Sequence, residues 1–267
     1  MSNDSLVLVD TDSRGVATVT LNRPEVNNAY NAELVQALGD VFDELGKDAS
    51  VRIVVIRGNG PHFQAGADLK WLRQVGTLNA KENLTTSYRT ASLVRTLDEF
   101  PVPTIALIHG ACIGGGTGIA CACDLVIASD DATFAISEAR WGAIASIILP
   151  QLNAAIGVRN VRRYAITCEK FGAIKAQTMG LVHEIAPLGK LDEVAEPLID
   201  AILKCGPKAV SATKYWSQRA GERLDDEMFD MLVDVHANCR QSEEASEGFA
   251  SFIEKRDASW YVPKEVE

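Results

Sequence analysis

Hydrophobic residues recur with two different periods along the first part of the chain, and each period predicts an element. Residues 15–24, GVATVTLNRP, alternate with the period of two that is typical of a strand. Residues 31–45, NAELVQALGDVFDEL, carry apolar side chains at helical spacing, with Asn31 as an N-terminal cap. Short β-branched or apolar runs at 51–58, 104–110, 124–129 and 132–137 predict further strands. This alternation of strands and helices predicts an α/β fold with parallel pairing.

From about residue 190 onward the pattern is helical throughout. Four amphipathic segments occupy residues 191–204, 207–220, 226–239 and 242–256. We therefore expect a βα core over residues 1–190 and a helical region over residues 191–267. An extension of helices with exposed apolar side chains commonly packs against a second subunit, so we expect an oligomer.

Composition excludes some classes of function. The chain has 267 residues, of which 47% are hydrophobic, and can bury a large core. Its net charge of −10 argues against a nucleic-acid partner. No apolar stretch approaches the roughly 20 residues of a membrane span, and the start lacks the pattern of a secretory leader. We expect a cytoplasmic protein with no membrane partner. The six cysteines lack metal-ligand spacing, so we expect no metal.

Two loops rich in small residues each follow a predicted strand. Gly114, Gly115 and Gly116 precede a helix expected to begin near Thr117, and the sequence AGAD occupies residues 65–68. The first N–H groups of a helix have no partner within it, and glycine lets a ligand oxygen approach them. Close packing of the helix is the alternative explanation for the glycines alone. Together, the loops predict two N–H groups that hold one carbonyl oxygen.

A resemblance to a known family covers nearly the whole chain. It is carried by LNRPEVNNAY, FQAGADLK, PVPTIALIHGACIGGGTGIACACDLVIASDDATFAISEARWG and EGFASFIEKRDASW, which resemble the crotonase (enoyl-CoA hydratase/isomerase) superfamily. The resemblance implies a crotonase (ClpP-like) ββα spiral core with a C-terminal helical trimerisation region. It also implies an enzyme that binds an acyl-CoA substrate and works as a homotrimer or hexamer. No cofactor is expected, because coenzyme A is part of the substrate.

The same resemblance implies roles for individual residues. The N–H groups of Ala67 and Gly115 would form the oxyanion hole for the thioester oxygen. Lys70 and Lys255 would lie near the CoA phosphates, although ordinary surface lysines are an equal alternative. The complete set expected to contact substrate or CoA is Glu25, Val26, Asn27, Ala65, Asp68, Leu69, Lys70, Gly118, Arg140, Phe252 and Lys255.

The sequence departs from the family pattern at one of two catalytic glutamates. The first position is occupied by Gly118, whereas Glu138 matches the second. GGGTG and SEARWG resemble the branch of bacterial 3-methylglutaconyl-CoA and isohexenylglutaconyl-CoA (γ-carboxygeranoyl-CoA) hydratases. That branch implies a hydro-lyase that adds water to a C3-branched enoyl-CoA in leucine-type or acyclic-terpene catabolism. Glu138 would act as base and then as acid; a capping or ion-pairing role beside Arg140 is the alternative.

Several alternatives stay open at this point. Arg140 could bind a distal carboxylate of the substrate or form a structural ion pair. Ile144, Ile147, Ile148 and Leu149 could line a wide acyl pocket or belong to the core. A single-glutamate enoyl-CoA isomerase is the alternative activity, and a non-catalytic binding protein is a remote one. The sequence does not decide the acyl chain, trimer against hexamer, or what fills the space beside Gly118.

Overall fold

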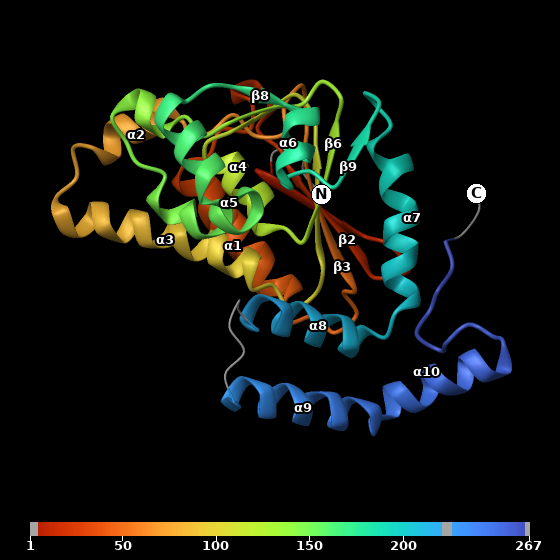
Figure 1. Cartoon of the computed structure of the whole chain (residues 1–267). Coiled ribbons are helices and arrows are strands. Elements are labelled where there is room, and N and C mark those ends of the chain that lie inside the picture. Colours follow the sequence, from red (N-terminus) through yellow and green to blue (C-terminus); the bar gives the residue numbers. More distant parts are fainter. Residues whose placement is uncertain (1–4, 221–225, 265–267) are drawn as a thin grey trace.

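The computed structural model describes residues 5–220 and 226–264 (Figure 1). Residues 1–4, on which the expectation of no secretory leader partly rests, lie outside the described residues. Two β-sheets form the centre, and helices cover them. The predicted α/β class is confirmed.

The larger sheet has six strands in the order β1-β2-β3-β4-β6-β9. β1 is antiparallel to β2, and all the other neighbours are parallel. A smaller sheet has the order β5-β7-β8. The strands are β1 (Val7–Thr11), β2 (Val16–Leu21), β3 (Ile53–Gly58), β4 (Thr104–Ile108), β5 (Ala111–Ile113), β6 (Leu125–Ser129), β7 (Thr133–Ala135), β8 (Phe171–Gly172) and β9 (Glu184–Ala186).

The helices cover both faces of the larger sheet and continue into a helical tail (Figure 1). They are α1 (Ala32–Leu45), α2 (Leu69–Val75), α3 (Ala80–Asp98), α4 (Gly115–Ala122), α5 (Leu149–Thr167), α6 (Ala173–Met179), α7 (Leu191–Lys204), α8 (Pro207–Arg219), α9 (Asp226–Arg240) and α10 (Glu243–Glu254). Three short 3₁₀ helices are η1 (Pro24–Val26), η2 (Glu138–Trp141) and η3 (Ser146–Ile148).

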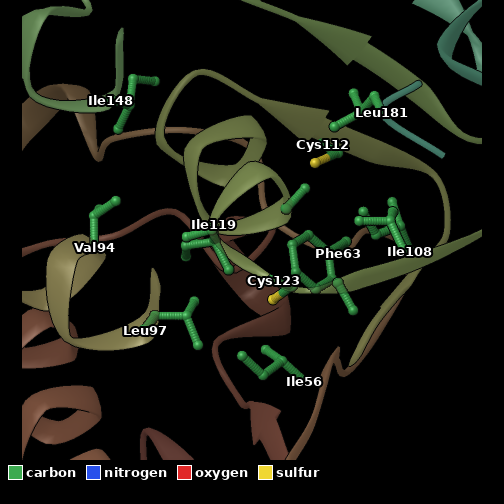
Figure 2. Close-up of a cluster of buried hydrophobic side chains, with 14 of the residues drawn as sticks. Ile56, Phe63, Val94, Leu97, Ile108, Cys112, Ile119, Cys123, Ile148 and Leu181 are labelled. Carbon is green, nitrogen blue, oxygen red and sulfur yellow. The ribbon is translucent and has the colours of Figure 1, made fainter. Parts of the chain in front are cut away.

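Alternation along the strands divides the apolar residues between two cores. In β3, Val54 and Ile56 face the core that contains α1, α3 and α4, whereas Ile53 and Val55 face α7. Both faces are apolar because helices cover the parallel strands on both sides. Figure 2 shows part of the larger core, where Phe63 lies near α4. α7, grouped with the tail from its sequence, therefore packs on the sheet.

Every strand predicted from the sequence is present within one to three residues of its expected limits. The predicted helix 31–45 is α1, and the Asn31 side chain accepts the main-chain N–H of Leu34 at 3.0 Å. The helix expected near Thr117 begins two residues earlier, at Gly115. This start matters because it leaves the N–H of Gly115 outside the helical hydrogen bonds.

Hydrogen bonds join α10 and the residues after it to α7 and α8. The Glu244 carboxylate of α10 accepts the N–H groups of Lys208 and Ala209 at 2.9 and 2.7 Å, at the start of α8. The indole of Trp260 donates to the carbonyl of Lys204 at 3.1 Å. α9 and α10 also carry exposed apolar side chains: Phe229, Met231, Val233, Phe249, Phe252 and Ile253. Within the described residues, no helix is both long enough and apolar enough to cross a membrane.

A nearly buried ion pair joins α8 to the larger sheet. Lys214 Nζ lies 2.7 Å from Asp124 Oδ2. Thr104 also donates two hydrogen bonds to the Asp124 carboxylate, so this carboxylate keeps hydrogen-bond partners when Lys214 is replaced. We expect Lys214→Met to lower the free energy of unfolding by about 1–3 kcal/mol in urea titrations. Lys175→Met, at an exposed position of α6, is the matched control, and equal stability of the two variants would contradict this role.

Candidate active site

The loop after β3 presents a free main-chain N–H at Ala67. Tyr30 pairs with this loop as an isolated parallel bridge: its N–H donates to Gly66 O at 2.9 Å and its carbonyl accepts Asp68 N–H at 2.8 Å. Both bonds use the residues on either side of Ala67, so the Ala67 N–H is left without an acceptor among the described residues. Gly66 makes the turn with a φ of +91°.

The second loop lies between β5 and α4. Gly114 has φ 55° and ψ −117°, a conformation open almost only to glycine, and its N–H donates to Ala135 O at 2.8 Å. Gly115 follows as the first residue of α4, so its N–H has no acceptor within the helix. The N–H groups of Ala67 and Gly115 are therefore both available to a ligand.

Tyr30 and Gln64 hold the two loops together. The Gln64 amide accepts the N–H of Gly66 at 2.8 Å, and Gln64 Oε1 would lie 2.6 Å from a Cβ added to Gly116. Tyr30 Cε1 would lie 2.5 Å from a Cβ added to Gly115. Glycine is thus required at both positions, because it allows the two loops to approach each other.

Two connected spaces meet at these loops. A wide cavity of about 850 Å³ is lined by Ala67, Gly115 and Glu138 among others. A narrow cavity of about 80 Å³ continues from it between apolar side chains of α1 and α3. It is several times larger than the space that one water needs. A ligand with a bulky polar part and a slender apolar part fits this combination.

Glu138 lies at the start of η2 and lines both cavities. Its carboxylate is next to Gly114, where an added Cβ would be 3.0 Å from Glu138 Oε1. The other oxygen, Oε2, is buried and has no hydrogen-bond partner in the described part of the chain. Burial raises the pKa of the Glu138 carboxyl above its ordinary value, and the N–H groups of Glu138 and Ser137 oppose this in part. Such a carboxylate is suited to taking up a proton.

Ile148 occupies the space beside Gly118. A Cβ on Gly118 would lie 2.5 Å from Ile148 Cγ2, and Gly118 itself is buried in α4. The space where a second carboxylate is expected in the family is thus filled by an apolar side chain. Gly118, predicted to contact the substrate, lines neither cavity.

The remaining predicted site residues fall into two groups. Ala65, Leu69 and Arg140 line the wide cavity, together with the predicted Ala67, Gly115 and Glu138. The Arg140 guanidinium donates to the carbonyl of Cys168 at 3.3 Å. Residues that line neither the wide nor the narrow cavity are Glu25, Val26, Asn27, Asp68, Lys70, Phe252 and Lys255.

Local structure accounts for several residues of this second group. Asp68 caps α2, where its carboxylate accepts the N–H of Lys70 at 2.9 Å. The carbonyl of Asn27 accepts the N–H of Ala65 at 3.0 Å, so the 25–27 segment supports the loop behind the cavity. Phe252 and Lys255 lie exposed at the end of α10.

Sequence reasoning missed two kinds of residue at the site. Tyr30 and Gln64 stand within quoted motifs, but neither was given a role. Thr90 and its neighbours lie on α3, far along the chain from both loops, and reach the cavity only through the packing of that helix. No local sequence pattern marks them as site residues. Ile144, Ile147 and Ile148 line the narrow cavity, whereas Leu149 lines neither cavity. Over the described residues, His, Cys, Asp and Glu form no cluster of three or more that could hold a metal.

The contact between Gly118 and Ile148 predicts the effect of a single methyl group. We expect Gly118→Ala to lower the free energy of unfolding by about 1–3 kcal/mol, because the methyl overlaps Ile148. Gly39→Ala is the matched control, since nothing lies within 4 Å of a Cβ there and α1 gains a better helix former. Urea unfolding measures both variants. Equal free energies of unfolding for Gly118→Ala and Gly39→Ala would show that no side chain fills the space beside Gly118.

The raised pKa of Glu138 predicts a pH-dependent stability difference. A carboxyl with a raised pKa in the folded state stabilises the protein below the unfolded value of about 4.5, and this contribution is lost as pH rises through the folded pKa. Glu138→Gln is neutral throughout, so we expect it to be more stable than wild type at about pH 7. The difference should shrink as pH approaches about 4 in urea titrations.

Glu44→Gln, an exposed carboxylate near the end of α1, serves as the control for this pH series. The free energy of unfolding of Glu44→Gln is expected to stay within about 0.5 kcal/mol of the wild-type value at both pH values. A Glu138→Gln variant less stable than wild type at neutral pH would show that the carboxylate is stabilised, not destabilised, by its surroundings.

Comparisons with known proteins identify the family of this chain. Residues 11–262 match the family model described as "Enoyl-CoA hydratase/isomerase". The hydroxycinnamoyl-CoA hydratase-lyase of Pseudomonas fluorescens is 36% identical over 224 residues, which cover 82% of this chain and 80% of that protein. The mitochondrial Δ(3,5)-Δ(2,4)-dienoyl-CoA isomerase of Dictyostelium discoideum is 31% identical and covers 94% of this chain and 89% of its own length.

A solved structure extends the similarity to three dimensions. The enoyl-CoA hydratase of Shewanella pealeana superposes with a TM-score of 0.92 at 33% identity, over 96% of both chains. The family match spans both loops, Glu138 and the tail, which together make up the site and its supports. The chain therefore belongs to the enoyl-CoA hydratase/isomerase family of enzymes.

Proposed function

We propose that this enzyme adds water across the double bond of a C3-branched enoyl-CoA, with 3-methylglutaconyl-CoA and isohexenylglutaconyl-CoA as the candidate substrates. The observation that carries the proposal is the pairing of the Glu138 carboxylate, whose Oε2 is buried and unpartnered among the described residues, with the free N–H groups of Ala67 and Gly115. Acyl-CoA binding is common to the family, and the branched acyl group is the part proposed for this member.

In the proposed reaction, the thioester oxygen accepts the N–H groups of Ala67 and Gly115. Glu138 removes a proton from water while the water oxygen forms a bond to C3. The π electrons of the double bond move toward the thioester oxygen, and the N–H groups stabilise the resulting enolate. The protonated Glu138 then returns its proton to C2. Acid–base help of this kind accelerates a reaction by about 10²–10⁴-fold.

The single carboxylate supports a substrate branched at C3. Water attacks a carbon that becomes tertiary, and positive character developing there is better tolerated than at an unbranched carbon. The reaction then depends less on a second carboxylate, whose position beside Gly118 is filled by Ile148. The narrow apolar cavity suits an aliphatic chain such as an isohexenyl group.

A basic side chain in the wall of the wide cavity supports a substrate that carries a distal carboxylate. Arg140 lines this cavity, and among the described residues a single guanidinium nitrogen is hydrogen-bonded, to the carbonyl of Cys168. Its fork of N–H groups suits a carboxylate. The exposed apolar side chains of α9 and α10 support the expected trimer or hexamer, and the cytoplasmic location also stays a prediction.

A second candidate is an enoyl-CoA isomerase. Glu138 alone could carry a proton between C4 and C2 of the substrate, and the Dictyostelium relative is named as an isomerase. The isomerase moves the double bond and adds no water, so conjugation is kept or formed. We favour hydration because of the match to the branched-substrate hydratases at residues 114–118 and 137–142.

Ultraviolet absorbance at the enoyl-thioester band separates the two activities. We expect loss of the band with C3-branched enoyl-CoA substrates, and faster loss when the branch carries a carboxylate. Glu138→Gln should lower kcat by at least about 100-fold. Glu184→Gln, an exposed carboxylate on β9, is the control and should retain activity.

Two results would contradict the proposal. Interconversion of alkenes with no loss to a hydroxyacyl product would assign the isomerase. An equally rapid reaction of unbranched enoyl-CoA would remove the preference for branching, and near-full activity of a folded Glu138→Gln variant would remove the role of Glu138.

A further inference from the structure

Six residues line both cavities and so mark the place where they meet: Tyr30, Thr90, Gly115, Glu138, Ile144 and Ile147. A thioester oxygen held at Ala67 and Gly115 places the adjacent carbons at this junction, with the rest of the acyl chain in the narrow cavity. Polar side chains at the junction are therefore the ones able to touch the reacting atoms. These are Tyr30, Thr90 and Glu138.

Of the three, Thr90 is occupied by its own helix. Its hydroxyl donates to the carbonyl of Thr86 at 3.2 Å. The Tyr30 hydroxyl, in contrast, makes no hydrogen bond within residues 5–220 and 226–264. Glu138 Oε2 is likewise unpartnered. Two residues with unused hydrogen-bonding capacity thus line the junction of the two cavities.

The Tyr30 ring is fixed in place from several sides. Its main chain is bonded to Gly66 and Asp68, and its ring edge lies against Gly115. Trp71 packs against it edge to face, with 5.5 Å between ring centroids. The hydroxyl is therefore held relative to both N–H groups of the oxyanion hole, which is the placement that orientation of a reactant requires.

The charge state of Tyr30 is also defined. Burial, and then the charge of Glu138, raise the pKa of Tyr30 to about 12. The phenol stays protonated at neutral pH and does not compete with Glu138 as a base. It still offers an oxygen that accepts one hydrogen bond and an O–H that donates one.

We propose that the Tyr30 hydroxyl is a further catalytic group, which holds the water that Glu138 activates. The proposal rests on the proposed hydration and assigns to Tyr30 the second contact to that water, in a site where Ile148 occupies the space beside Gly118.

The step balances without a proton from tyrosine. One O–H of the water donates a hydrogen bond to Glu138, and this proton transfers to Glu138 as the water oxygen forms a bond to C3. The other O–H donates a hydrogen bond to the Tyr30 oxygen, and its hydrogen remains on the new hydroxyl group of the product. The π electrons move toward the thioester oxygen as before, and Glu138 returns its proton to C2. Tyr30 therefore acts in the step that involves water and in no other.

Tyr30→Phe tests this role, because it keeps the ring against Gly115 and Trp71 and removes only the hydroxyl. Two reactions are measured for each variant: hydration of the best enoyl-CoA substrate, and exchange of the C2 hydrogen of a saturated acyl-CoA in D₂O. Exchange needs Glu138 and the two N–H groups but adds no water. Tyr88→Phe, at an exposed position of α3, is the matched control.

We expect Tyr30→Phe to lower kcat for hydration by about 10–100-fold, with KM changed less than about threefold and C2 exchange within about threefold of wild type. Glu138→Gln should lose both reactions. Equal losses of hydration and exchange in Tyr30→Phe would show that the hydroxyl supports the site as a whole and would overturn the proposal.

Hydration by Tyr30→Phe at the wild-type rate would overturn this proposal alone and leave the proposed function standing. A wild-type enzyme that exchanges C2 hydrogen but hydrates no enoyl-CoA would overturn both. These outcomes separate the failure of the tyrosine assignment from the failure of the hydratase assignment.

Discussion

The structure depends on keeping two main-chain N–H groups free at the wall of a cavity, although main-chain N–H groups of folded proteins are normally paired. Ala67 and Gly115 achieve this by different means. The bridge with Tyr30 uses only the neighbours of Ala67, and the start of α4 leaves Gly115 without a helical acceptor. Both residues are half-buried, and the surrounding chain fixes their backbone so that the N–H groups stay free. Gln64 and Tyr30 supply that constraint by contacting both loops.

Chemistry at this site is governed by what surrounds a single carboxylate. Glu138 is half-buried and one of its oxygens has no partner, so the ionised form is costly and ready to accept a proton. Ile148 fills the space beside Gly118, so the proposed acid–base chemistry depends on Glu138 alone. A protonated phenol beside it adds hydrogen bonding without adding a second base.

The sequence was informative where a local pattern determines local structure. Apolar alternation located β2, apolar or β-branched runs located β3, β4, β6 and β7, and Asn31 located the start of α1. The two loops rich in small residues predicted free N–H groups, which the family resemblance assigned to Ala67 and Gly115. Contacts between distant segments could not be predicted in this way. The approach of Ile148 to Gly118 and the position of Thr90 at the cavity depend on how η3 and α3 pack. Tyr30 is an intermediate case, because it adjoins a predicted motif but its contacts arise from pairing with residues 66–68.

The bridge between Tyr30 and Ala67 has a consequence for how the chain acquires its activity. The proposed oxyanion hole joins segments near residues 30, 67 and 115, and Glu138 adds a fourth. No fragment that ends before the smaller sheet contains all four. Such non-local pairings form late, because the chain must close long loops before it gains the contacts. A ribosome-bound or truncated chain could therefore acquire much of its larger sheet while still being catalytically silent.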